Sequence, residues 1–223
     1  MMEEKVGEDS MDRKSFMRNY WMYYLMLEER FIQSTRYIEP VEDNEEVYSL
    51  EYVNQLQAIG SEIDVLMKVI CNISQSARKT IADYYPIIVH KIPNITTYRV
   101  RCYNFEFKPF ETWLQAQPSQ SLFWWDAYNQ IKHGRVEKFK FANMKVVMYA
   151  LSALCLLELL YLKEIVKNQQ LLDRPDRESE IFRFPDINYQ YINVGGGLIL
   201  EMRSSQKDDP AEVDTLILDG GSL

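Results

Sequence analysis

The sequence contains little of what usually crosslinks a chain or holds a metal: three cysteines and two histidines in 223 residues. Cys71, Cys102 and Cys155 are an odd number, and with the histidines they lack the paired spacing of zinc ligands. We therefore expect free, buried thiols in a reducing compartment, and neither a metal nor a cofactor.

A hydrophobic run long enough to cross a membrane is also missing from the sequence. The most apolar stretch, residues 146–162, falls short of the ~20 residues that span a bilayer and carries Glu158 near its end. Residues 1–13 are charged and lack the apolar centre of a signal peptide, which predicts a disordered polar tail. We expect a cytoplasmic protein without membrane contact, in which residues 146–162 form a central buried helix.

Positive charge is in the minority, with 25 basic against 33 acidic residues and a net charge of −8. This balance opposes broad, non-specific binding to nucleic acid or to an anionic membrane. Any contact with a polyanion must therefore be local. Hydrophobic residues nevertheless make up 47 % of the chain, which is enough for the core of one domain.

Apolar residues recur at spacings of three and four in several segments, which indicates amphipathic helices. Ser49 is a suitable N-cap for the second of them, and Gly134 is well placed to end the fourth. We expect helices over residues 14–38, from 49 to about 73, from 80 with an interruption at Pro86, over 122–132 and over 142–167. The predicted fold is mainly α: an antiparallel helical bundle over residues 14–170.

Two other segments have a β pattern. Residues 94–110 alternate large apolar and polar side chains, which favours an extended segment or a small hairpin. Residues 173–180 are rich in charge and predict a hinge. Beyond them, residues 171–223 are expected to form a linker and a small β-containing C-terminal appendage, with strand-like pieces at 181–184, 189–194, 197–202 and 214–218.

The chemically richest stretch is residues 124–145. It holds His133, with Asn129 four residues earlier, so that on a helix both would project from one face. Histidine exchanges protons near neutral pH, and RNA carries its own nucleophile in the 2′-hydroxyl, so its cleavage needs proton transfer and cations but no metal. Five cations accompany His133 in this stretch: Lys132, Arg135, Lys138, Lys140 and Lys145.

Each of these features also has a purely structural interpretation. A histidine in the last turn of a helix interacts favourably with the negative end of the helix dipole. Asn129 could be a capping or core-edge amide, and the basic residues could form a solvated connector. Trp124, Trp125 and Tyr128 at helical spacing are more often core packing than a platform for stacking bases.

Residues 128–133, with the sequence YNQIKH, resemble the motif of the HEPN family of all-helical proteins. That motif is an arginine, a polar residue that is often asparagine, a few further residues and a histidine. Asn129 and His133 match it, whereas Tyr128 stands at the arginine position, so Lys132 and Arg135 are the candidates to replace that charge. The resemblance covers about residues 14–167. The two long helices expected at the start of the chain also resemble those of HEPN domains in their acidic residues: Glu28 and Glu29 in the first, Glu62 and Asp64 in the second.

The resemblance implies a homodimer that binds RNA and cuts it without metal, in a prokaryotic defence or toxin–antitoxin system. His133 and Asn129 would be catalytic, and the substrate would be bound by Tyr128, Lys132, Arg135 and Lys138. The alternative is a non-catalytic helical module that binds a partner protein, or a subunit of a defence complex. Tyr128 in place of arginine, the acidic net charge and the strand edges of the appendage favour this alternative.

Overall fold

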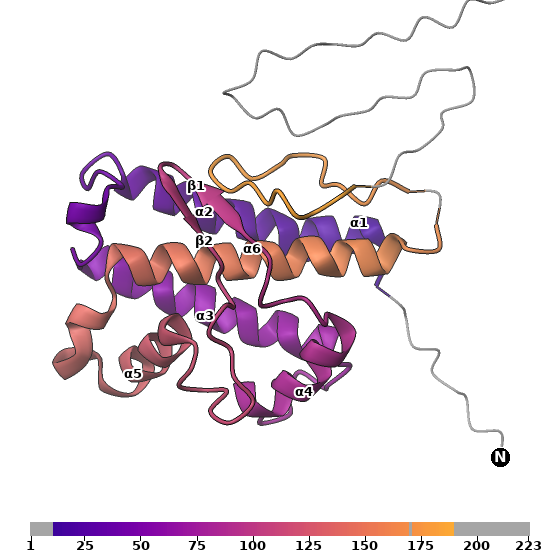
Figure 1. Ribbon diagram of the computed structural model, residues 1–223, viewed down its shortest axis with the longest axis horizontal. Helices are drawn as coiled ribbons and strands as arrows, with labels where there is room; N and C mark the ends of the chain where they lie inside the picture. Colours follow the sequence, from indigo (N-terminus) through magenta and orange to yellow (C-terminus); the bar gives the residue numbers. More distant parts are fainter. Residues whose placement is uncertain (1–10, 170, 190–223) are drawn as a thin grey trace, which may run out of the picture. The chain divides into compact units, whose positions relative to one another are not determined.

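The computed structural model describes residues 11–169 and 171–189, and these are mainly helical (Figure 1). An N-terminal helical segment, formed by α1, η1 and α2, is followed by four α-helices, α3 to α6. A two-stranded sheet lies between α4 and α5 in the chain. The elements are α1 (Arg13–Phe16), the π-helix η1 (Met17–Trp21), α2 (Met22–Ser34), the 3-10 helix η2 (Glu42–Asn44), α3 (Leu50–Ile70), α4 (Ile81–Lys91), β1 (Val100–Cys102), β2 (Phe105–Phe107), α5 (Phe123–Lys138), the 3-10 helix η3 (Phe139–Phe141) and α6 (Met144–Val166).

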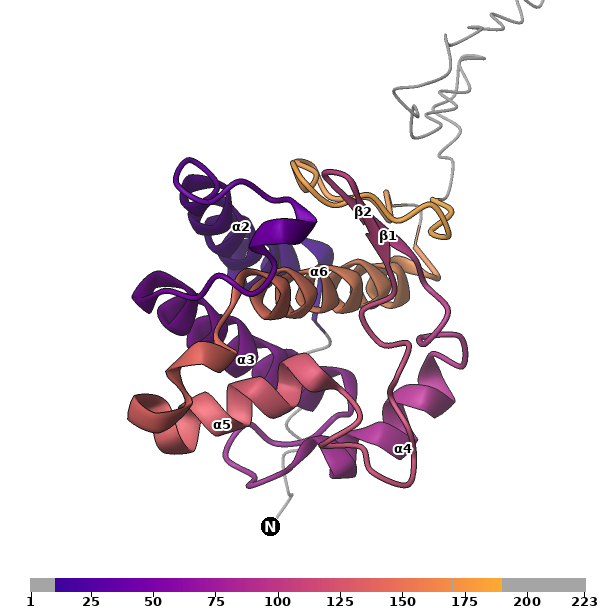
Figure 2. The ribbon, with the colours of Figure 1, turned by 60° about the vertical axis from the view of Figure 1, so that its left-hand side comes forward.

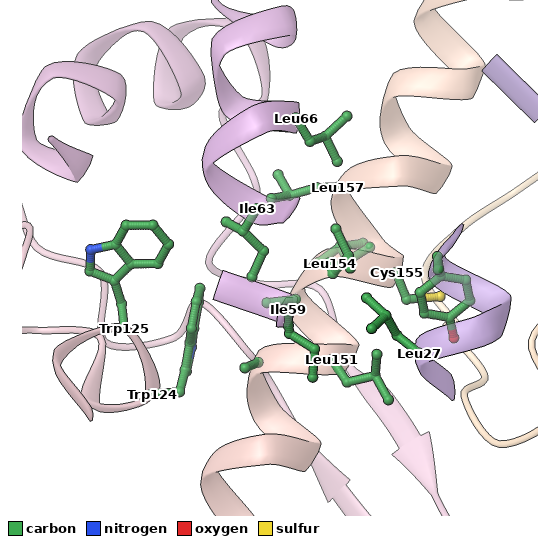
Figure 3. Packing of buried hydrophobic residues seen from close by; sticks show 14 of the residues in the cluster. Leu27, Ile59, Ile63, Leu66, Trp124, Trp125, Leu151, Leu154, Cys155 and Leu157 are labelled. Carbon is green, nitrogen blue, oxygen red and sulfur yellow. The ribbon is translucent and has the colours of Figure 1, made fainter. Parts of the chain in front are cut away.

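Helix α6 is the centre of the core, as its sequence predicts. Its apolar side chains pack against those of α3 and against Leu27 of α2 (Figure 3). Contrary to the expectation from the sequence, α6 is long and apolar enough to cross a membrane, but 78 % of its most apolar window is buried inside the protein. The figure labels Leu151, Leu154, Cys155 and Leu157 of α6 beside Ile59, Ile63 and Leu66 of α3.

Helices α3 and α6 form a central pair that runs in one direction. Just before the two helices begin, Tyr48 and Asn143 form a β-bridge, and further along Glu62 of α3 faces Glu158 of α6. Helix α2 runs opposite to both, and it lies on the other side of the pair from α5 (Figure 2). The predicted antiparallel pairing of the first two long helices is therefore confirmed for α2 and α3.

The ends of the helices confirm some of the predicted boundaries and correct others. Ser49 caps α3 by accepting a hydrogen bond from the backbone N–H of Tyr52 at 3.1 Å. The first helix ends at Ser34, four residues earlier than predicted. Pro86 does not interrupt α4, whose start is fixed by reciprocal hydrogen bonds between Thr80 and Asp83.

The β pattern of residues 94–110 forms a hairpin, in which β1 and β2 pair antiparallel from Val100↔Phe107 to Cys102↔Phe105. The turn places Tyr103 at a φ of 52°, in the left-handed region. Phe107 stacks on Tyr149 of α6, with ring centroids 3.9 Å apart, so the hairpin packs on the central helix.

The predicted hinge at residues 173–180 is instead held against the helices. Glu28, which is buried in α2, accepts hydrogen bonds from the hydroxyls of Tyr24 and Ser179 and, at 2.9 Å, from the backbone N–H of Glu180. Arg183 then forms a β-bridge with Arg101 of the hairpin. Of the predicted β appendage, only residues up to 189 belong to the described structure; its other strand-like pieces, like residues 1–10 of the predicted tail, lie outside it.

Candidate functional site

Helix α5 is anchored by its aromatic residues. Trp124 and Trp125 are buried, and the indole N–H of Trp124 donates a hydrogen bond of 2.7 Å to the carbonyl oxygen of Pro109 (Figure 3). Ile131, about two turns further along the helix, is fully buried as well. These side chains belong to the core. The helical spacing of the aromatic residues therefore reflects core packing and not a platform for stacking bases.

Tyr128 fixes the distance between α5 and α3. Its ring lies so close to Gly60 of α3 that a Cβ atom at Gly60 would be 2.4 Å from it. Only 5 % of Tyr128 is exposed, so most of its surface is used in packing, while it also lines the pocket described next. Its role in substrate binding stays a prediction. The ring also supports Lys132, whose Nζ lies 5.5 Å from the ring centroid.

A pocket of about 500 Å³ lies beside α5 and gathers the residues of the matched motif. Asn129, Lys132 and His133 line it from α5, with Trp125 and Tyr128 at its edge. The predicted placement of Asn129 and His133 on one helix face is therefore confirmed. His133 is exposed and Asn129 is half-buried, and within the described structure no hydrogen bond engages either side chain.

The pocket is also lined from α3 and from residues 75–81, which lead into α4. These segments contribute three cations, Lys68, Arg78 and Lys79, together with Asp64. These contributors could not be predicted from the sequence, because nothing in the pattern around residue 78 links it to His133. Their common location depends on how α5 packs across α3.

Arg135 and Lys138, which were predicted to bind substrate, do not line this pocket. The backbone leaves helical geometry at Gly134, so both residues follow a kink in α5. Lys138 instead lies over Phe141, with its Nζ 5.7 Å from the ring centroid. Gly134 thus bends α5 after His133 but does not end it as expected. The guanidinium that lines the pocket is that of Arg78, not that of Arg135.

Two of the pocket cations are paired with carboxylates. Lys68 lies 2.8 Å from Asp64, and Lys79 lies 3.4 Å from Asp83. The hydroxyl of Tyr84 donates a hydrogen bond of 2.8 Å to Asp64, and burial, followed by this bond, raises the pKa of Tyr84. Arg78 has no ion pair or hydrogen bond among the described residues, and Lys132 has only its contact with the Tyr128 ring.

Comparisons of the chain with protein-family models, with curated proteins and with solved structures find no match. Within residues 11–169 and 171–189, no group of three or more histidine, cysteine, aspartate or glutamate side chains could hold a metal ion. All three cysteines are buried and free.

Proposed function

We propose that this chain is a HEPN-like, RNA-binding protein of a prokaryotic defence or toxin–antitoxin system, with a metal-independent endoribonuclease-type site in the pocket beside α5. One observation carries the proposal. Asn129 and His133, the two matched motif residues, share a pocket with several cations, and the described structure provides no hydrogen-bond partner for either side chain. Side chains that are polar, accessible and without a partner are available to a ligand.

The chemistry follows from the groups in the pocket. The imidazole of His133 accepts the proton of the 2′-hydroxyl, and the 2′-oxygen attacks the neighbouring phosphorus. The bond from phosphorus to the 5′-oxygen breaks, and a protonated imidazole supplies the proton of that leaving oxygen. The products are a 2′,3′-cyclic phosphate and a free 5′-hydroxyl. Asn129 donates hydrogen bonds from its amide to the phosphate oxygens.

Two proton-transfer groups are needed, and α5 provides one histidine. A two-fold symmetric homodimer would bring a second copy of His133 to the same phosphate. Dimerisation therefore belongs to the proposal. A variant that stays monomeric would lack the second imidazole, and it should not cleave RNA.

The direct test is cleavage of a labelled single-stranded RNA in the presence of EDTA. His133→Ala should reduce the rate by about 100-fold or more, as expected for loss of a general acid–base. His90→Ala is the matched control, because His90 is an exposed histidine of α4 that does not line the pocket. Mass spectrometry should detect the cyclic phosphate. A wild-type protein that leaves RNA intact, or an unchanged rate in His133→Ala, would refute the nuclease.

The second candidate is a non-catalytic module that uses the same pocket to bind a partner. It is favoured by Tyr128, which occupies the motif's arginine position and is packed against Gly60 instead of lying free in the pocket. This candidate predicts that no RNA is cleaved under any condition. Cleavage that disappears in His133→Ala but not in His90→Ala would rule it out.

A further inference from the structure

We infer that Arg78 and Lys132 form a two-sided clamp for one phosphate group of a single-stranded nucleic acid. The inference rests on the proposed function for the identity of the strand, and it adds a binding residue outside α5. Arg78 belongs to the connection between α3 and α4, and Lys132 belongs to α5, so the two cations that line the pocket come from different segments of the fold.

The pairing of charges singles out these two residues. Of the pocket cations, Lys68 is neutralised by Asp64 at 2.8 Å and Lys79 by Asp83 at 3.4 Å. Lys68 also donates a hydrogen bond to the carbonyl oxygen of Gln75, so it holds the connection in place. The positive charge left for a ligand is therefore that of Arg78 and Lys132.

The two side chains suit different parts of the task. A guanidinium presents a planar fork that binds two phosphate oxygens at once, whereas an ammonium is a compact point charge. Lys132 is oriented by the Tyr128 ring beneath it, at 5.5 Å from its centroid. The clamp thus joins a bidentate donor on the connection to a positioned charge next to Asn129 and His133.

Helix α4 begins at the same pocket but does not supply the anion site itself. Its N-cap residue Thr80 lines the pocket, but the Thr80 backbone N–H donates a hydrogen bond of 2.8 Å to the carboxylate of Asp83. A carboxylate of the chain therefore occupies the start of the helix. Side-chain cations must hold the phosphate, which assigns the task to Arg78 and Lys132.

The test is binding of a fluorescent single-stranded RNA whose 2′-oxygens are methylated, so that it binds but is not cut. Arg78→Ala and Lys132→Ala should each weaken binding by about tenfold or more, as expected for lost charge-assisted hydrogen bonds. Each should also lower the slope of log affinity against log salt by about 0.7, the value for one phosphate contact on a single strand. Arg78→Lys should restore the salt slope but only part of the affinity.

Arg36→Ala is the matched control. It removes the same charge from an exposed side chain that follows α2 and does not line the pocket. The clamp predicts that this variant keeps both the affinity and the salt slope. Because Arg78 is exposed and has no partner in the described structure, its replacement should leave the thermal unfolding curve unchanged.

The clamp and the nuclease can fail separately. If the methylated RNA binds in an Arg78-dependent way but ordinary RNA is never cut, the clamp stands and the nuclease fails. If cleavage depends on His133 but Arg78→Ala keeps full affinity, the nuclease stands and the clamp fails. Equal effects of Arg78→Ala and Arg36→Ala, or no binding by the wild-type chain, would also overturn the clamp.

Discussion

Glu158 should make this protein less stable as the pH rises. It lies on α6, is 0 % exposed, and neither carboxyl oxygen has a hydrogen-bond partner among the described residues. Burial raises the pKa of Glu158 well above its usual range, and the nearby carboxylate of Glu62 adds to the effect. The pKa of Glu62 is itself raised by burial, so the two groups act in the same direction.

The sign and size follow from proton binding. In the unfolded chain a glutamate loses its proton near pH 4.3, whereas in the folded chain Glu158 keeps it to a higher pH. Above that pH the folded state therefore binds one more proton than the unfolded state. The free energy of unfolding then falls by about 1.4 kcal/mol for each further pH unit, until the folded carboxyl also ionises. The contribution is fully present only below the pKa of the unfolded state. Asp186, whose pKa is lowered by Arg99, has the opposite sign but titrates below this range.

The assay is urea unfolding at one-unit intervals from pH 5 to pH 8. Glu158→Gln keeps the shape of the side chain and removes its titration. Its stability relative to wild type should increase by about 1.4 kcal/mol per pH unit for as long as the folded Glu158 stays protonated, and then level off. Glu164→Gln is the control, because Glu164 lies on the same helix but is exposed, and its curve should follow that of wild type. Parallel pH profiles for Glu158→Gln and wild type would refute the argument that Glu158 is neutral and unpartnered in the fold.

Two further substitutions test the packing that supports the site. Gly60→Ala would place a Cβ atom 2.4 Å from the Tyr128 ring, so it should cost about 1–3 kcal/mol in thermal unfolding and weaken RNA binding by shifting α5. In a Tyr128→Ala background the same change should cost much less, and equal costs in both backgrounds would contradict the contact. Glu28→Gln should cost about 1.5–3 kcal/mol, because a neutral amide accepts the bonds from Ser179 and Glu180 poorly. Faster proteolysis within residues 171–189 of this variant should report their release, whereas unchanged protection would contradict it.

The features that were predicted correctly depend on neighbouring residues in the chain. The Ser49 cap and the apolar periodicity define α3, and continuous apolarity identifies α6 as the central helix. The alternation around residue 100 defines the hairpin, and a spacing of four residues puts Asn129 and His133 on one face. Each of these depends on local geometry, which a single sequence carries.

The features that were missed depend on contacts between distant segments. Nothing in the sequence near Glu28 indicates that its carboxylate accepts hydrogen bonds from residues 179 and 180. The charge of these residues alone predicts a hinge. Pro86 was expected to break a helix, but the flanking packing of Tyr84 and Ile88, both fully buried, retains it.

Tyr128 is explained by the same packing, and its role bears on the proposed chemistry. An arginine at this position would have to place its charge where the tyrosine ring now meets Gly60, in a region with 5 % exposure. Burying a guanidinium is costly, so this position of the helix favours an aromatic ring over a phosphate-binding cation. Any phosphate held beside His133 must then be met by cations from elsewhere in the pocket. The departure at Tyr128 therefore does not decide the function by itself; the function depends on whether Arg78 and Lys132 supply the charge that the motif lacks.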